Sequence, residues 1–200
     1  MTDTGIATHR QTAIDTVFRR LFENEFATLD GIAISHQVDG ELEYIDETVA
    51  LGRMLDIGSA FEPFEPVDPD TYALHAAMHA AWPETQAVVS GWSRHLKALL
   101  DEDMALPACT SMMRKRGVSD LSEYLVGPAA LRDARLPTTL AAARATAQRN
   151  EMAHVLVISD DGMVVVAGPT EIEAMAHWHN IEFAARVECL RVEEIAVHLG

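Results

Sequence analysis

Residues 70–92 read DTYALHAAMHAAWPETQAVVSGW, and their pattern gives the clearest indication of the fold. The first half of this stretch is rich in alanine and predicts a helix that ends at Pro83, because proline cannot continue the hydrogen-bonding pattern. His75 and His79 are four residues apart, so on this helix they share one face. A pair of imidazoles on one face is a candidate for chemistry, and it lies directly before a strand.

The second half of the stretch predicts a short apolar strand that begins at Ala87. Alternate side chains of a strand point the same way, so Val88, Ser90 and Trp92 would line one surface. Ser90 contributes a hydroxyl and Trp92 an indole at the end of this predicted buried strand. Many folds place functional side chains at such a point.

Hydrophobic periodicity predicts elements on both sides of this stretch. Ser93 is a suitable N-cap for the next helix, Thr138 or Thr139 for a later one, and Thr170 with Glu173 forms a capping box. Helical spacing covers residues 10–24, 93–100, 140–150 and 170 to past Val192, and strands are predicted over 31–36, 41–45, 154–158 and 163–167. Hairpin turns are expected at Asp39–Gly40 and over 159–162. Over 101–139 we expect loops with short segments of regular structure between them. Helices thus alternate with hairpins, which favours one α/β domain with a largely antiparallel central sheet and helices on its faces.

Composition limits the partners and the compartment. The 200 residues suffice for one well-filled domain, expected over 10–200 after a loose arm at 1–9. The 31 acidic and 15 basic residues give a net charge of −16, which disfavours nucleic acid and anionic membranes as partners. The chain has no run long enough for a bilayer and no signal-peptide pattern, so we expect a cytoplasmic protein. Cys109 and Cys189 are expected to be free thiols, and Arg114–Arg116 a solvated loop rather than an anion site.

Four stretches together carry a resemblance to a known family. They are DGIAISH at 30–36, LHAAMHAAWPETQAVVSGW at 74–92, VLVISDDGMVVVAGPTEIEAM at 155–175 and IEFAA at 181–185. In this order and at these separations the chain resembles the class II aldolase/adducin family over most of residues 10–190. The resemblance implies a three-layer αβα fold, a mixed or antiparallel sheet and an assembly of identical subunits, often a tetramer. It also implies a site at the subunit interface, where three histidines hold a divalent metal for aldol cleavage, isomerisation or related chemistry.

The residues at the implied positions differ from the family pattern. Ser90 and Trp92 stand where the resemblance implies a His-x-His metal pair, and Asp161 stands where it implies the third histidine. Thr71 occupies the region of the family's acidic residue, and Ile32 that of an asparagine which holds a substrate phosphate. An indole has no lone pair to donate to a metal, and one carboxylate is too few ligands for a zinc-type site. We therefore expect no metal or other cofactor at the family position, and a pocket lined by Ser90, Trp92, Thr71 and Ile32 for a small ligand without a required phosphate.

Three functional hypotheses follow from this mismatch. The first is a metal-independent lyase or isomerase that acts on a small carbonyl or hydroxy-acid compound, with Asp161, His95 and His75 as the groups able to move protons and Trp92 as a wall. The second is a non-catalytic assembly or binding module, like the adducin head domain. The third is a metalloenzyme with a relocated site at His75, His79 and His95.

One further histidine pair lies near the C-terminus. His177 and His179 are two residues apart on the predicted helix, so they cannot both face one ion. Glu182 follows His179 by three residues and could orient it. A structural or interface role is the interpretation for this pair.

Overall fold

The computed structural model describes residues 31–38, 41–46, 68–104, 106, 113, 121–132 and 134–199. Its centre is one six-stranded sheet with the order β2-β1-β3-β6-β5-β4. The strands are β1 (Ala33–Val38), β2 (Glu41–Asp46), β3 (Ala87–Trp92), β4 (Leu125–Val126), β5 (Val155–Ser159) and β6 (Met163–Gly168). The pairing of β4 with β5 is parallel and the other pairings are antiparallel, which confirms the largely antiparallel mixed sheet.

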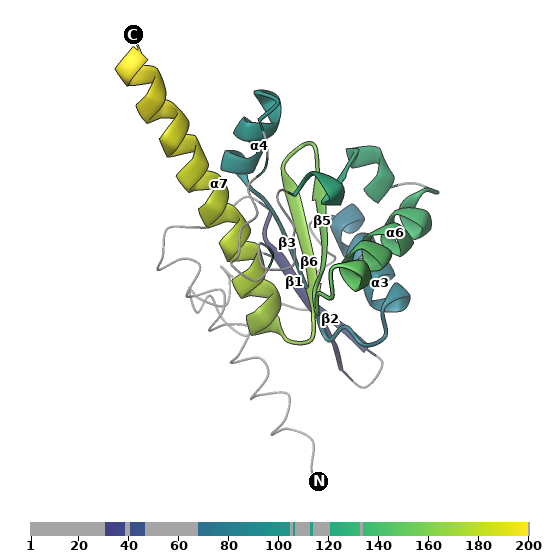
Figure 1. The fold of residues 1–200 in the computed structure, drawn as a ribbon. Helices are drawn as coiled ribbons and strands as arrows, with labels where there is room; N and C mark the ends of the chain where they lie inside the picture. The colour runs from purple at the N-terminus through teal and green to yellow at the C-terminus, as the bar shows by residue number, and fades with distance from the viewer. Residues whose placement is uncertain are drawn as a thin grey trace, which may run out of the picture.

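Helices cover both faces of this sheet (Figure 1). They are α3 (Pro69–Ala81), α4 (Arg94–Asp101), α6 (Leu136–Arg149) and α7 (Glu171–Leu199), with the short 3-10 helices η1 (Ser122–Tyr124) and η2 (Pro128–Leu131). Helices α3 and α6 lie on one face, and α7 lies on the other with α4 beside it (Figure 1). The predicted three-layer α/β architecture is therefore confirmed.

The alternation of side chains along β3 and β6 divides the core into two layers. Val88 and Val165 pack with Leu74 and Met78 of α3 on one face. Val89, Val166 and Ala87 point the other way, toward Leu96 of α4 and Trp178 of α7. Both faces of the two strands are buried, as expected for strands that carry continuous apolar runs between two helical layers.

Local capping residues set where most of the helices begin. Asp68 caps α3, accepting hydrogen bonds from the backbone N–H groups of Asp70 at 3.0 Å and Thr71 at 3.3 Å. The hydroxyl of Ser93 accepts the N–H of Leu96 at 2.9 Å, which confirms the predicted cap of α4. The Thr170 capping box is also confirmed, because Thr170 Oγ1 accepts the N–H of Glu173 and donates to its carboxylate.

One predicted helix boundary is wrong. Helix α6 begins at Leu136 rather than near Leu140, and it has no side-chain cap, so neither Thr138 nor Thr139 serves as one. Pro137 explains the earlier start, because proline fits the first helical turn, where its missing N–H costs nothing. Helix α7 continues to Leu199, which agrees with the prediction that it ends past Val192.

Several predictions concern residues outside the described ranges. They are the arm at 1–9, the helix at 10–24, the turn at Asp39–Gly40, Cys109 and the basic run 114–116. Cys189 is described as a free, half-buried thiol whose S–H donates to the backbone carbonyl of His95 at 3.4 Å. In the part of the chain with described structure, none of the helices combines the length and apolar character that a membrane crossing requires.

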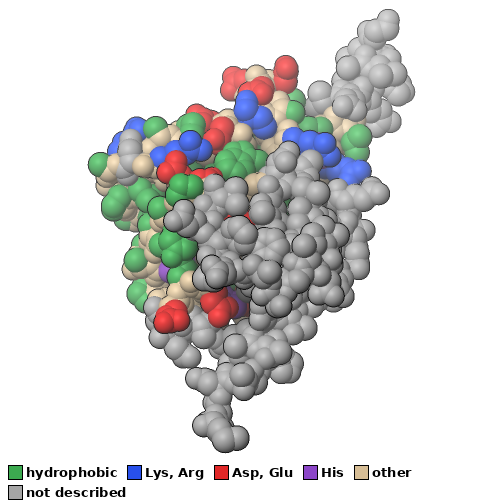
Figure 2. Space-filling model, turned by 180° about the vertical axis from the view of Figure 1, so that it is seen from behind, with side chains coloured by type: hydrophobic (Ala, Val, Ile, Leu, Met, Phe, Trp, Pro, Cys, Tyr) green, Lys and Arg blue, Asp and Glu red, His purple; other side chains and the backbone are tan. Residues whose placement is uncertain are grey.

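Several charged side chains on the described surface form ion pairs. Lys97 pairs with Asp101, Arg144 with Glu84 at 2.5 Å and Arg149 with Glu123 at 2.7 Å. Figure 2 shows basic and acidic side chains close together where the rear face is described. This mixed pattern differs from the uniform basic stripe that nucleic-acid binding requires.

Candidate functional site

Strand β3 presents Val88, Ser90 and Trp92 on one surface, as its periodicity predicts. Ser90 faces α3, where its Oγ is 2.8 Å from Nε2 of His75. Both side chains are 0% exposed. The structure therefore joins two of the predicted site residues, but it does so inside the core.

The Ser90–His75 contact belongs to a longer buried network. Nδ1 of His75 is 2.8 Å from Oγ of Ser35 on β1, and the same oxygen is 3.0 Å from Nε2 of His79. Burial, and then the proximity of His79, lowers the pKa of His75 to about 3. A neutral imidazole donates at one nitrogen and accepts at the other, so His75 satisfies both hydroxyls without carrying charge.

This placement corrects the expected catalytic role of His75. A group that moves a proton to or from a bound ligand must reach that ligand. His75 is enclosed, and both of its ring nitrogens are occupied by serine hydroxyls. Its role in this structure is to connect α3 to β1 and β3.

Trp92 fills the space at the end of β3. The indole lies directly against Gly31, where an added Cβ would be only 2.2 Å from Cε3 of Trp92. Gly31 also has a φ of +87°, a backbone conformation that side chains other than glycine rarely adopt. The half-buried indole therefore depends on a glycine beneath it.

The three positions that correspond to the expected metal ligands do not form a metal-binding set. The hydroxyl of Ser90 is engaged by His75, and Trp92 offers no lone pair. Oδ1 of Asp161 accepts the backbone N–H of Met163 at 3.2 Å, which closes the turn between β5 and β6. In the described ranges, no group of three or more His, Cys, Asp or Glu side chains is arranged to hold a metal ion.

Thr71 and Ile32 lie on opposite sides of the sheet. Thr71 is buried on α3, and its hydroxyl donates to Asp68 Oδ2 at 2.6 Å. It borders a cavity of about 10 Å³ that Met163 also lines, which has room for about one water molecule. Ile32 is 3% exposed and packs over Gly91 in the other core layer. Its expected contact with substrate is therefore corrected to a core role.

The relocated metal site is not assembled either. His75 and His79 approach each other through Ser35 on the α3 side of the sheet. His95 lies at the start of α4 and is bonded to α7, which covers the other side. The sheet separates the two parts of the hypothetical ligand set.

His95 instead forms a site with a residue that is far from it in the sequence. Its Nδ1 is 2.5 Å from Oε1 of Glu182 on α7, and Ser93 donates its hydroxyl to the other carboxylate oxygen. The Glu182 side chain is 6% exposed, whereas that of His95 is 25% exposed. A buried carboxylate thus orients a histidine that solvent can reach. Glu182 was predicted to orient His179, but its hydrogen-bond partner among the histidines is His95.

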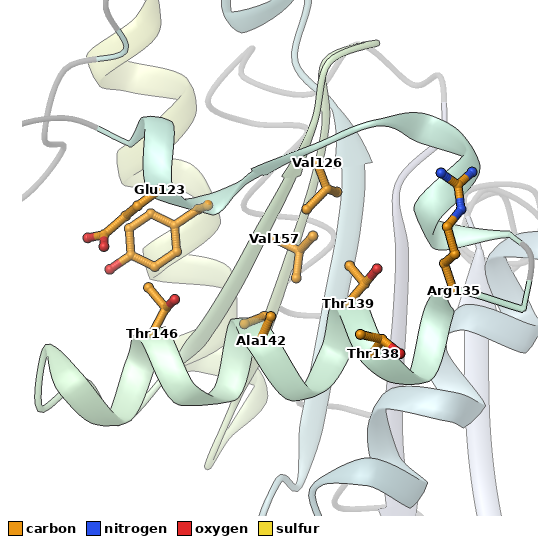
Figure 3. Close-up of a pocket in the computed structure, with 10 residues that line it drawn as sticks. Glu123, Val126, Arg135, Thr138, Thr139, Ala142, Thr146 and Val157 are labelled. Carbon is orange, nitrogen blue, oxygen red and sulfur yellow. The ribbon is translucent and has the colours of Figure 1, made fainter.

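A larger cavity of about 360 Å³ lies between α6 and the edge of the sheet (Figure 3). It exists because the small side chains of Ala142 and Ala143 face Val126 of β4 and Val157 of β5. Tyr124 closes one end, where its hydroxyl accepts a hydrogen bond from the Asn150 amide at 2.9 Å. None of the predicted site residues lines this cavity.

Comparison with known proteins identifies the family to which this fold belongs. The family model for the class II aldolase and adducin N-terminal domain matches residues 46–189. A search of curated proteins found no match. Among solved structures, an L-fuculose 1-phosphate aldolase from Glaciozyma antarctica is similar with a TM-score of 0.58 and 15% identity, over 95% of this chain and 77% of that one.

Two further solved structures have the same fold. An L-fuculose-1-phosphate aldolase from Thermus thermophilus gives a TM-score of 0.56 at 12% identity, covering 90% of this chain and 93% of its own. An aldolase II superfamily protein from Pseudomonas syringae gives 0.54 at 17% identity, covering 87% and 71%. At such identities the likeness concerns the fold, and the chemistry has to be argued from the residues present.

Proposed function

Because this chain belongs to the class II aldolase and adducin N-terminal domain family, yet has Ser90, Trp92 and Asp161 at the expected ligand positions, we propose that it is a metal-independent enzyme. It would be cytoplasmic and would catalyse proton transfer of the lyase or isomerase type. Its substrate would be a small carbonyl or hydroxy-acid compound without a required phosphate. The observation that carries this proposal is the His95–Glu182 pair.

The geometry of this pair suits a general base. Nδ1–H of His95 donates to the buried Glu182 carboxylate at 2.5 Å, which leaves Nε2 as the basic nitrogen. When Nε2 takes a proton from a carbon next to a carbonyl group, the carboxylate stabilises the imidazolium that forms. Ser93 holds the second carboxylate oxygen, so Glu182 cannot rotate away. Asp161, whose side chain closes the turn between β5 and β6, is the second candidate for proton transfer and lies near the end of β3 that carries Trp92.

The residues present support metal independence and a substrate without phosphate. The Ser90 hydroxyl is directed into the core, and Asp161 is the one carboxylate in the set of three. Ile32, at the position expected to hold phosphate, contributes an aliphatic side chain with no donor. The Ile32 side chain itself offers a phosphate dianion no compensating charge.

A second function is favoured by the closed core around Ser90. The cavity beside Thr71 holds only about 10 Å³, and His75 and Ser90 are fully buried and hydrogen-bonded to each other. These features also suit an assembly or binding module, whose function would be to form a homotetramer. Sedimentation of the purified chain together with the activity test below distinguishes the two functions, because a module assembles but exchanges no substrate protons.

Replacement of His95 by glutamine is expected to lower proton exchange by about 10²- to 10⁴-fold, the usual contribution of general base catalysis. The exchange is followed by ¹H NMR in D₂O, as loss of the carbon-bound proton signal of dihydroxyacetone, glycolaldehyde or lactaldehyde. Glu182→Gln removes the charge that stabilises the imidazolium and should also lower the rate. Treatment of the wild-type protein with a chelator should leave the rate unchanged.

His179→Gln is the matched control, because His179 lies on α7 beside Glu182 without the hydrogen bond that His95 makes. It should retain the wild-type rate. Exchange that requires added zinc, or that survives His95→Gln, would contradict the proposed mechanism. An intact oligomer that exchanges none of the three probes would favour the module.

A further inference from the structure

The first two turns of α7 are held to the sheet by two histidine contacts with opposite requirements for protonation. One joins Glu171 to His36 of β1, and the other joins His177 to His154 at the start of β5. Both contacts lie within Glu171–Trp178. The same helix carries Glu182 a little over one turn farther on.

The His36 contact requires a charged ring. Nδ1 of His36 is 2.6 Å from Oε1 of Glu171, and Nε2 is 2.5 Å from Oε2 of Glu43 on β2. Ionised carboxylates only accept hydrogen bonds, so both ring nitrogens must carry a proton. Burial of the ring opposes this charge, but the hydrogen bonds and charges of Glu171 and Glu43 outweigh burial and raise the pKa of His36 above 6.5. In the described part of the chain His79 on α3 also interacts with this ring, and its own pKa is lowered, mainly by burial and to a smaller extent by the charge of His36.

The second contact requires neutral rings. The imidazoles of His154 and His177 are stacked with centroids 5.0 Å apart and an interplanar angle of 2°. In the described structure the Nε2 atom of each ring is buried and has no hydrogen-bond partner. A proton added there would create a buried cation with no acceptor, next to a second imidazole. The ring of His154 lies close over Gly168 of β6, where a Cβ would be 2.8 Å from its Cδ2.

Few charged groups offset this cost. Glu173 is the carboxylate that acts on His154, and it raises the pKa of that ring less than burial lowers it. Burial, and then His154, lowers the pKa of His177 to about 4. The stack therefore remains neutral and intact near pH 7.

From these contacts we propose that α7 docks its first two turns on the sheet only within a window of pH, bounded by the His154–His177 stack on the acid side and by the His36 ion pairs on the alkaline side. The device is a two-sided pH-sensitive clamp, defined by Glu171–Trp178 and the three histidines. Loosening of this clamp frees the segment of α7 that precedes Glu182.

The direction in which pH changes docking follows from the linkage between proton binding and docking. Below pH 6.5 the undocked segment binds protons at His154 and His177 that the docked segment excludes, so docking weakens as the pH falls. For His177 alone, a shift from 6.5 to about 4 corresponds to roughly a 300-fold change in the docking equilibrium, at tenfold for each pH unit. His36 has the opposite sign: its contribution is complete below pH 6.5 and is lost as the pH rises through its raised pKa.

Hydrogen exchange of the full chain, read by mass spectrometry over residues 171–181, tests the clamp directly. After correction for intrinsic exchange rates, protection in the wild-type protein should peak at intermediate pH and fall toward both pH 5 and pH 9. His177→Phe keeps an aromatic ring in the stack but cannot be protonated, so it should reduce the acid-side loss, leaving the part due to His154, and should not change the alkaline side. His36→Gln cannot carry charge and should remove the alkaline-side loss only.

Burial also lowers the pKa of His179, so His179→Gln, the control on the same helix outside Glu171–Trp178, should retain the alkaline side of the profile and most of the acid side. NMR titration of the wild-type histidine rings gives an independent result if a variant folds poorly: His36 should titrate above pH 6.5 and His177 well below it. Flat protection between pH 5 and pH 9, or both losses persisting in both variants, would overturn the clamp. Titration of both rings near 6.5 would overturn it as well.

Discussion

Replacement of Gly31 by alanine is expected to destabilise the protein by about 3 kcal/mol or more. Two costs add: a residue with a side chain at positive φ costs roughly 1–2 kcal/mol, and overpacking of a filled site costs about 1–3 kcal/mol. The Cβ of the new residue would lie 2.2 Å from Cε3 and 2.4 Å from Cζ3 of Trp92. These are atoms of a rigid ring, so the indole as a whole would have to move. Urea unfolding of the two proteins measures the difference.

Gly127→Ala is the matched control, because a Cβ at Gly127 meets no atom within 4 Å. Its free energy of unfolding should change by less than about 0.5 kcal/mol. Removal of the indole by Trp92→Ala should recover part of the Gly31→Ala loss in the double variant, since the two residues share one space. If Gly31→Ala were as mild as Gly127→Ala, Trp92 would not fill the end of β3 as described.

A fall in pH from 7 to 4 is expected to remove about 3 kcal/mol of stability through His75 alone. The pKa of His75 in the folded protein is lowered to about 3, mainly by burial, whereas an unfolded histidine has a pKa near 6.5. Between these values the unfolded chain holds a proton that the folded chain excludes. Stability is therefore complete above pH 6.5 and falls as the pH drops toward 3. Urea unfolding at a series of pH values measures this slope.

Other histidines with lowered pKa values add to the total loss, among them His79, His154 and His177. The contribution of His75 is isolated by comparison with His75→Gln, which is less stable at neutral pH because Ser35 and Ser90 lose their partner. Between pH 6.5 and 4 its free energy of unfolding should fall less steeply with pH than that of the wild-type protein. The difference in slope corresponds to nearly one bound proton. Equal slopes for the two proteins would show that His75 is not enclosed and neutral.

The elements with clear periodicity and local caps could be predicted from the sequence. Residues 70–92 predict α3 and β3, because alanine content, Pro83 and the apolar run all act locally. The Ser93 and Thr170 caps are also local signals, since each hydroxyl bonds a residue three positions ahead. The predicted start of α6 is too late because a proline such as Pro137 usually breaks a helix, although it is favourable in the first turn.

The contacts that define the candidate site could not be predicted, because they join residues far apart in the chain. His95 and Glu182 are 87 positions apart, and His75 and Ser35 are 40 apart. Helical spacing favoured Glu182 with His179, but the packing of α4 on α7 gives the carboxylate to His95. Spacing likewise placed His75 and His79 together, and it could not show that Ser35 and Ser90 enclose them in the core.

The most direct test of the central claim is a crystal structure of the wild-type protein grown with zinc, with anomalous scattering recorded at the zinc edge. We expect the Trp92 indole to fill the end of β3 and no ion to lie between Ser90, Trp92 and Asp161. A strong anomalous peak at that position, with Asp161 as a ligand and the indole displaced, would contradict the claim.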